Sequence, residues 1–573
     1  MESQHEVPVN AEIESIIQGL DERIEKELEE YRAKVTAGNV VGIQYMGLGN
    51  LATLLPLYCH PSSRFYRSEE LIPLMDVASA AFLASQHPSG CVSLANCNID
   101  SPPDTSFTSH LAAYVFQLAV RYGSPEIEEI TGRIRLFLER AKPCLLTGGI
   151  HTPNHRWVMA SALAKMEEIF GGDEFRKRAF QFLDEGLDIT EYGEWTERSN
   201  AIYNAICAYH LYNVGVTFGH EPSLDAARST LRMTQYMLHP GDTIVTEYSG
   251  RQDYNAVMKM DDRYYVAFHL LANRFQDPEL AALARVAQRT APKGALPLIH
   301  YMVEPENMTL PEAGGDEAPD SYTVLFGENR STPVPDDVWY HGPLLKHPHG
   351  APVLRHRRGK LSVTAMAGQP EMLYLQYGAA RLLGLKISAG WFGIGGVAFP
   401  SIHKLSEDTY RMEILLKGSY FQPLPEEHYR AAKGSYIDMP NHLRERTNVV
   451  TVPIELQITL YDDGADLRLR SEDRAGIFLQ ATASFDLNGT ITADALEELE
   501  PNLHRLTAGA ALFRNGADWI RIEGGAVEHQ EVMMRNDSHM RKAQHLTMNF
   551  TTPTDRTIRL RCGDDGAGSE RRD

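Results

Sequence analysis

The feature that most constrains the fold is a change in hydrophobic periodicity near residue 310. Before it, apolar residues recur every third or fourth position, as on one face of a helix, and beyond it they recur every second position, as on a strand. The change coincides with Pro311, Gly314, Gly315 and Pro319 among acidic residues, a composition typical of a linker. We therefore predict a helical domain over 1–310, a linker over 311–321, an antiparallel β domain over 322–562 and a disordered tail over 563–573.

The first half begins with an amphipathic helix whose apolar face runs from Ile13 to Val35. Helix-like segments of similar length follow, and short loops rich in Gly, Pro, Asn and Asp separate them. Paired helices joined by short loops are typical of helical hairpins arranged in a ring or a solenoid. We favour a closed ring, because it brings the loops beside alternate helices together at one end. The expected segments are roughly 40–57, 67–86, 106–122, 126–142, 154–170, 174–187, 198–216, 222–238, 260–274 and 277–288.

The second half carries hairpin signals. Apolar residues alternate from Ile454 to Leu460, the turn Asp462-Asp463-Gly464 follows, and alternation resumes at Leu467. Asn488-Gly489 and Asn515-Gly516 supply two further turns of the same kind. A domain of about 240 residues suits a large sandwich or several layered sheets better than a small barrel.

Composition limits the partners of this chain. A net charge of −21 argues against the broad positive surface that nucleic acid or anionic lipid requires. Residues 1–10 are polar and acidic, unlike a signal peptide, and no stretch approaches ~18 consecutive apolar residues. We expect neither a nucleic-acid nor a membrane partner.

The six cysteines are scattered and form no C-x-x-C pair. We interpret them as reduced thiols, which favours a cytoplasmic location. They are Cys59, Cys91, Cys97, Cys144, Cys207 and Cys562.

Four polar clusters in the helical half are candidates for a functional site. The densest is 188–204, a Gly-broken turn that leads Tyr203 and Asn204 onto the first turns of a helix. The others, 96–105, 152–157 and 247–254, also precede helices. A ring would therefore gather His155, Tyr203 and Arg251 at one mouth. Simpler interpretations are a helix cap by Asp104 or a neighbouring hydroxyl, a helix cap by Asn154, and an Arg251–Asp253 surface pair.

This set of side chains suits β-elimination from a uronic acid. That reaction needs a neutralised carboxylate, a base for the C5 proton and an acid for the departing O4. Asn154, His155 and Arg251 can neutralise the carboxylate, and Tyr203 can transfer the protons. A phenol has an unperturbed pKa near ~10, and a neighbouring arginine or protonated histidine lowers it.

Asn154-His155 opening a helix, followed by a turn that ends at Tyr203, resembles the heparinase II/III-like and alginate-lyase-type polysaccharide lyases. The resemblance covers the chain from about residue 40 onward. It implies an incomplete (α/α) toroid followed by a C-terminal antiparallel β-sandwich. By this resemblance Asn154 and His155 neutralise the uronate, His155 is also a candidate base, and Tyr203 is the general acid or acid–base. The expected substrate-binding residues are Asn98, Trp195, Glu197, Asn200, Tyr248, Tyr254 and His403.

One departure concerns the sandwich. These lyases often carry a further catalytic histidine there, but 361–400 contains none, and His403 and Tyr420 are the nearest substitutes. We expect no cofactor. A structural metal in the β domain stays open, although the local histidines lack a fixed carboxylate spacing. These histidines are His341, His347, His349 and His356.

Two other classes of protein remain open. A glycoside hydrolase would need a pair of carboxylates, available from Glu194, Glu197, Asp253 and Asp261. A non-catalytic carbohydrate-binding protein would use only aromatic rings. For a lyase we expect short acidic oligosaccharides as substrates and a locally positive or neutral cleft. The cations expected there are Arg156, Arg198 and Arg251, whereas the uronate, its linkage, the endo or exo mode and the oligomeric state stay open.

Overall fold

The structure is a computed structural model. It describes residues 7–36, 47–291, 294–312, 315, 317–337, 349–432 and 434–566. The chain forms two compact units, one of Met1–Gln235 with Val257–Ala318 and one of Tyr236–Ala256 with Pro319–Asp573. The predicted domains differ from this division at one segment, because 236–256 groups with the β unit.

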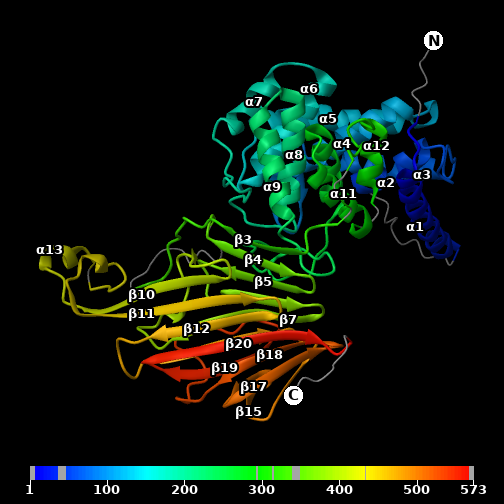
Figure 1. The fold of residues 1–573 in the computed structure, drawn as a ribbon. Coiled ribbons are helices and arrows are strands. Elements are labelled where there is room, and N and C mark those ends of the chain that lie inside the picture. The colour runs from blue at the N-terminus through cyan, green and yellow to red at the C-terminus, as the bar shows by residue number, and fades with distance from the viewer. Residues whose placement is uncertain are drawn as a thin grey trace. The chain divides into compact units, whose positions relative to one another are not determined.

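The first unit is built from two layers of helices (Figure 1). Consecutive helices of the inner layer contact one another, and α12 contacts α2, which closes the ring as expected. The inner helices are α2 (Leu48–Cys59), α4 (Pro102–Tyr122), α6 (Asn154–Phe170), α8 (Tyr203–Phe218), α10 (Asp262–Phe275) and α12 (Ala295–Val303). The outer helices are α1 (Ala11–Thr36), α3 (Leu71–Ala84), α5 (Glu128–Thr147), α7 (Glu174–Leu183), α9 (Glu221–Thr234) and α11 (Pro278–Thr290).

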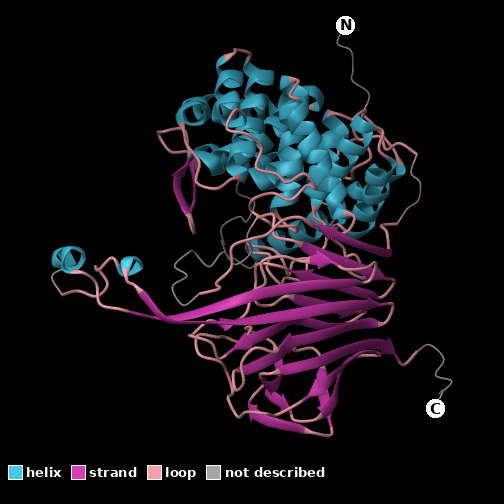
Figure 2. Cartoon of the chain, turned by 60° about the vertical axis from the view of Figure 1, so that its left-hand side comes forward, coloured by secondary structure: helices cyan, strands magenta, loops and turns pink. Residues whose placement is uncertain are grey.

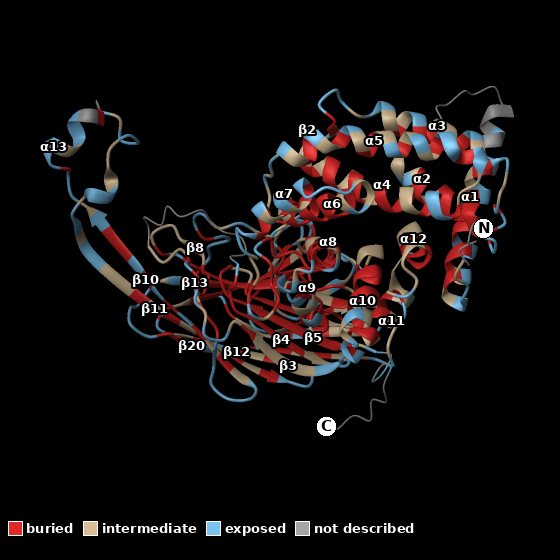
Figure 3. Cartoon of the chain, turned by 90° about the horizontal axis from the view of Figure 1, so that it is seen from above, coloured by how far each residue is buried: buried red, intermediate tan, exposed pale blue. Residues whose placement is uncertain are grey.

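Burial explains the layers. The middle of α6 and of α8 is buried on all sides, whereas the outer helices keep an exposed face (Figure 3). The sequence prediction missed α12, because a short apolar run that contains a proline is not separated from a strand by its pattern. No helix among the described residues is long and apolar enough to cross a membrane.

The start of α4 also differs from the prediction. The helix begins at Pro102 rather than near residue 106, and the Ser101 hydroxyl caps it by accepting a hydrogen bond from the Asp104 amide at 3.2 Å. Proline is tolerated in the first helical turn, where its missing N–H would have no intrahelical partner. The tandem prolines therefore start the helix. The hairpin of β1 (Val92–Leu94) and β2 (Asn98–Ser101) precedes it.

The cysteine prediction is wrong for one pair. Cys91 and Cys144 form a disulfide, with a Cα–Cα distance of 5.8 Å, while Cys59, Cys97, Cys207 and Cys562 are free. The two partners are 53 residues apart in sequence. The packing of the first helical hairpins brings them together, so no local sequence motif predicts the disulfide.

We expect the bridge to stabilise the helical unit. A disulfide that closes a loop of this length contributes roughly 2–4 kcal/mol, mainly by restricting the unfolded chain. Cys91→Ser combined with Cys144→Ser should lower the free energy of unfolding by about that amount, measured by denaturant unfolding without reductant. Cys97→Ser is the matched control, because Cys97 is an exposed free thiol. Equal stability of the double variant and the control would contradict a formed bridge.

The second unit is a sandwich of two mainly antiparallel sheets (Figure 2). One sheet has the order β14-β17-β18-β20-β12-β11-β10-β9, and the other β15-β16-β19-β13-β7-β6-β5-β4-β3 with β8 paired to β7. Only the β16–β19 pairing is parallel among the described strands. Apolar residues from both sheets, such as Val363 and Ile458, join in one buried cluster.

The strands of the larger sheet are β3 (Ser321–Phe326), β4 (Val353–Arg358), β5 (Leu361–Met366), β6 (Leu373–Tyr377), β7 (Ala380–Ala389), β8 (Gly395–Gly396), β13 (Phe478–Phe485), β15 (Leu496–Glu500), β16 (Leu503–Leu506) and β19 (Gln544–Thr551). Those of the other sheet are β9 (His403–Lys404), β10 (Thr409–Phe421), β11 (Arg446–Tyr461), β12 (Gly464–Ser471), β14 (Thr490–Ala493), β17 (Gly509–Asn515), β18 (Asp518–Gly525) and β20 (Thr554–Asp564).

Two of the three predicted hairpin turns are confirmed, those of β11–β12 and β17–β18. Asn488-Gly489 instead joins β13 to β14, which lie in different sheets. The predicted tail is wrong at its start, since β20 includes Gly563 and Asp564, and 567–573 lie outside the described residues. Beyond the sandwich, β10 and β11 continue as a two-stranded ribbon that carries α13 (Glu426–Tyr429) at its tip (Figure 2).

Candidate functional site

The helical unit places Asn154, His155 and Tyr203 at the starts of two neighbouring inner helices. Asn154 and His155 open α6 and Tyr203 opens α8, as predicted, and the two helices pack against each other. The first N–H groups of a helix lack intrahelical acceptors and favour negative charge. The starts of α6 and α8 are therefore suited to an anionic group.

A hydrogen bond ties the start of α6 to the loop before α8. Asn154 Nδ2 donates to Glu197 Oε2 at 2.7 Å and to Thr152 Oγ1 at 3.1 Å. Asn154 is 1% exposed and Glu197 is 7% exposed, so the contact is shielded from water. Since a carboxylate can only accept, Glu197 fixes which side of the amide faces it. Glu197, expected to bind substrate, therefore also positions Asn154.

His155 is nearly buried among aromatic rings. Its ring lies edge-on to His151 at 4.7 Å and to Phe107 at 6.3 Å between centroids. The Phe107 ring also contacts that of His210 at 5.7 Å, and the rings of His210 and His110 are 4.4 Å apart. Burial lowers the pKa of His210 to about 3 and that of His110 well below its usual value. Both imidazoles are therefore neutral near pH 7, and the interior beneath His155 carries no charge from them.

Glu194 and Arg198 form a buried ion pair in the loop before α8. Arg198 Nε lies 3.4 Å from Glu194 Oε2, and each side chain is 1% exposed. The pair thus holds the 188–204 turn. The sequence analysis gave Glu194 as a candidate hydrolytic carboxylate and Arg198 as a candidate cation of the cleft. Both side chains are instead buried in this ion pair.

We expect this pair to act on stability. Glu194→Gln leaves the Arg198 charge buried without its counter-charge and should lower the free energy of unfolding by about 3 kcal/mol. Thermal or denaturant unfolding measures the loss. Glu185→Gln, which breaks a 3.6 Å pair with Arg156 whose carboxylate is 55% exposed, should cost less than about 1 kcal/mol. A Glu194 variant as stable as this control would contradict a structural role.

Burial contradicts two further expectations for the helical unit. Trp195 is 2% exposed, and its ring lies 6.1 Å from that of Trp157, so no face is open for a sugar to stack on. Arg156 is committed to Asp188 at 2.5 Å rather than to an open cleft. Tertiary packing therefore turns Trp195 into the core, whereas Arg156 is partly exposed and held in an ion pair.

The remaining predicted residues of this unit are in hydrogen-bonded contacts. Asn200 is 1% exposed, accepts from Asn204 Nδ2 at 2.8 Å and receives the Tyr264 hydroxyl on its carbonyl oxygen. Asn98 donates to Asp104 Oδ2 at 2.8 Å. Asp261 caps α10 by accepting from the Arg263 and Tyr264 amides, so this hydrolytic candidate also has a structural role.

Tyr248, Arg251 and Tyr254 belong to the β unit with the rest of 236–256. Tyr248 is fully buried, which contradicts a stacking role, whereas Arg251 and Tyr254 are half-buried. Asp253 is also buried and accepts from the Ser249 hydroxyl at 2.9 Å. Arg251 thus lies between the buried Ser249 and Asp253, with exposed Gly250 and Gln252 beside it.

A buried polar cluster that the sequence did not predict holds this segment against the sheet. Arg355 of β4 donates to the carbonyl oxygens of Tyr236 at 3.0 Å and Leu238 at 3.1 Å. His239 pairs with Glu247 at 3.1 Å and with the Ser362 hydroxyl at 2.9 Å. Although burial alone would raise it, contacts with His239, Arg355 and the Thr364 hydroxyl lower the pKa of Glu247 to about 2. The carboxylate therefore stays ionised in the interior.

The substitutes for a sandwich histidine lie elsewhere in the β unit. His403 is exposed on β9 and pairs with the Ser401 hydroxyl at 2.8 Å, while Tyr420 on β10 is 64% exposed. Among the described residues, no three His, Cys, Asp or Glu side chains are grouped to hold a metal ion. His356 contacts Thr323 at 2.8 Å, and His341 and His347 lie outside the described residues.

Several solved structures have a fold similar to that of this chain. No family model and no curated protein match the sequence. Among solved structures, heparinase III matches with a TM-score of 0.51 at 9% identity over 90% of this chain and 77% of that one. Chondroitin AC lyase of Streptomyces coelicolor A3 matches with a TM-score of 0.51 at 12% identity, over 96% of this chain and 80% of that one. A Paenibacillus xanthan lyase matches with a TM-score of 0.50 at 8% identity, over 90% of this chain and 53% of that one.

These likenesses define the class of fold. The chain has the fold of these lyases, in which helical hairpins form an (α/α) toroid and an antiparallel β-sandwich follows, and the predicted fold class is confirmed. Identities of 8–12% establish the fold and not the reaction, since one fold can host many activities. The reaction depends on the side chains of the candidate site.

Proposed function

We propose that this protein is a polysaccharide lyase of the heparinase type, which cleaves a uronate-containing glycan by β-elimination and leaves a C4–C5 unsaturated uronate. The observation that carries the proposal is the placement of Asn154, His155 and Tyr203 at two adjoining helix starts within one ring. Solved lyases of heparin, chondroitin and xanthan with the same fold support it.

In the proposed reaction, the Asn154 amide and His155 bind the uronate carboxylate. The positive ends of α6 and α8 favour the same anion. As charge moves from C5 onto the carboxylate in the transition state, these fixed donors stabilise it more than they stabilise the substrate. They make the C5 proton acidic enough to remove.

Tyr203 is the proposed proton carrier. A base takes the C5 proton, the C5–H electrons form the C4–C5 double bond, and the C4–O4 bond breaks as O4 receives a proton. Tyr203 serves as acid or as acid–base, and His155 is the alternative base. No cofactor takes part in these steps. Arg251 stays a predicted contributor to carboxylate binding.

The substrate expectation needs one change. Short imported oligosaccharides were expected because a cytoplasmic location was predicted, and that location stays a prediction. The Cys91–Cys144 bridge argues instead for an oxidising compartment, where disulfides persist. We therefore propose an acidic glycan as substrate without limiting its length.

Ultraviolet absorbance tests the proposed function. Incubation with uronate oligosaccharides should produce a conjugated C4–C5 double bond, which absorbs ultraviolet light, in step with the number of bonds cleaved. A hydrolase yields new reducing ends without that absorbance. Cleavage of any uronate glycan without a rise in absorbance would reject the lyase assignment.

A further inference from the structure

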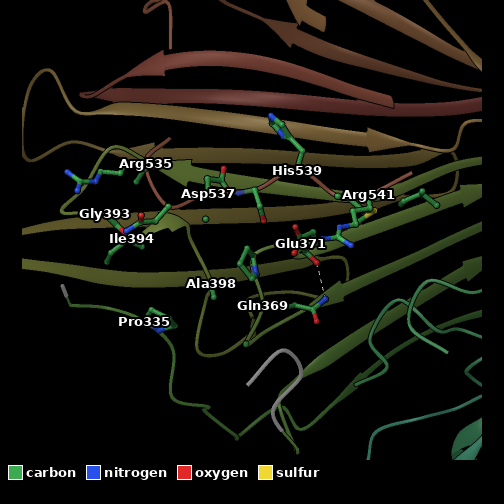
Figure 4. A pocket seen from close by; sticks show the side chains of 18 of the residues that line it. Pro335, Gln369, Glu371, Gly393, Ile394, Ala398, Arg535, Asp537, His539 and Arg541 are labelled. Carbon is green, nitrogen blue, oxygen red and sulfur yellow. Dashed lines mark hydrogen bonds between the residues drawn. The ribbon is translucent and has the colours of Figure 1, made fainter. Parts of the chain in front are cut away.

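The β unit contains a large cavity. It has a volume of about 1920 Å³, and all its lining residues belong to this unit. Its walls come from the loops after β5 and β7, from the segment 535–542 and from Tyr254 with Asn255 (Figure 4). The size suits a ligand of several sugar rings rather than a small ion.

The lining is locally cationic in an acidic protein. Three of its four acidic residues are already paired, Asp337 with Arg446, Asp486 with Arg381, and Asp537 with Lys386. The fourth is Glu371. Three lining cations, Arg535, Arg541 and Lys542, form no ion pair with any described residue and are exposed. Cations therefore outnumber unpaired anions here, although the chain as a whole carries −21.

A buried ion pair fixes the segment that carries these cations. Lys386 of β7 contacts Asp537 at 2.6 Å, and the two side chains are 4% and 5% exposed. The Ser388 hydroxyl donates to the same carboxylate at 2.7 Å. The segment is thus bound to a strand of the sheet, so Arg535 and Arg541 are presented from an anchored support.

A glycine-rich loop forms the adjoining wall. Asn536 Nδ2 donates to the Gly393 carbonyl at 2.9 Å. At Gly395, where φ is +71°, a Cβ would lie 2.9 Å from the Asn536 backbone, so only glycine lets the two loops approach. Trp391 and Phe392 precede these glycines and add apolar surface. In Figure 4, Arg535 lies toward Gly393 and Ile394, and Arg541 lies toward Glu371.

We propose that this cavity binds a stretch of acidic oligosaccharide, with Arg535, Arg541 and Lys542 contacting its carboxylate groups. Cations at both ends of one anchored segment match a ligand that repeats its negative charge along a chain. Aromatic and apolar walls suit the faces of sugar rings. The inference rests on the proposed function for its choice of glycan, but it concerns binding and not cleavage.

Calorimetric titration of the full chain tests it. The protein carries Tyr203→Phe so that cleavage of the probes is slowed. The probes are uronate-containing tetrasaccharides from heparan, chondroitin and polyuronate, with a neutral glucose tetrasaccharide for comparison. Each arginine–carboxylate contact is worth about tenfold in Kd. We expect Arg535→Ala combined with Arg541→Ala to weaken binding of the best acidic probe about 10²-fold.

Matched variants complete the design. Arg474→Ala removes one positive charge from an exposed loop outside the cavity and should leave Kd unchanged, while Arg541→Lys should retain most of the affinity. Equal affinity of the double variant and the parent, equal affinity for the neutral probe, or no binding of any acidic probe would overturn the proposal. Arginine-dependent binding in a protein that never produces ultraviolet absorbance would reject the lyase function alone.

Discussion

Tyr203→Phe should lower kcat by about 10²-fold or more with little change in KM. The substitution keeps the ring, the start of α8 and the contacts with sugar, and it removes the one group that can carry a proton between C5 and O4. Initial rates of ultraviolet absorbance on the best uronate substrate measure the effect. Stability should barely change, because the hydroxyl is the only group lost.

The hydrolase and binding interpretations give opposite patterns. If two carboxylates cleaved the bond, Glu197→Gln would abolish turnover and Tyr203→Phe would be mild. If the protein only bound sugars, neither the parent nor the phenylalanine variant would cleave them, and both would bind equally well because stacking needs only the ring. Near wild-type elimination by Tyr203→Phe would remove Tyr203 from the reaction.

Asn154→Ala should lower kcat/KM by about 10²- to 10³-fold, since a donor aimed at developing charge contributes that much to an enolate-like transition state. The variant also leaves the Glu197 carboxylate, now without its amide partner, near the substrate anion. Repulsion between the two carboxylates should add to the loss. Steady-state kinetics over a range of substrate concentrations separate kcat from KM.

Asn204→Ala is the control for this substitution. Asn204 is equally buried, lies on the first turn of α8 and donates to Asn200 at 2.8 Å, but it opens neither helix. A similar loss of stability in both variants, with the loss of activity confined to Asn154→Ala, is the expected pattern. Equal loss of activity in both would assign Asn154 a purely structural role.

Local patterns in the sequence predicted the helical ring and the starts of α6 and α8. Apolar spacing reports which face of an element is buried, and Asn154 and Tyr203 stand where that spacing begins. The same signal missed α12, because so short an apolar run does not distinguish a helix from a strand. It also misplaced 236–256, whose attachment through Arg355 and His239 depends on residues more than a hundred positions away.

Side-chain exposure was the harder part of the site. Trp195 and Tyr248 are residue types that stack on sugar rings, yet both are buried. Nothing in the local sequence separates a core aromatic side chain from an exposed one. The Cys91–Cys144 bridge and the cationic cavity likewise arise only when distant segments pack. Arg535 and Arg541 look like an ordinary polar loop until Lys386 and Asp537 anchor it.

The most direct test of the central claim is to follow ultraviolet absorbance and reducing ends together while the protein acts on uronate oligosaccharides. The account predicts that both rise in equal amounts, because each β-elimination creates one C4–C5 double bond and one new reducing end. Reducing ends that appear without absorbance would contradict it and indicate hydrolysis.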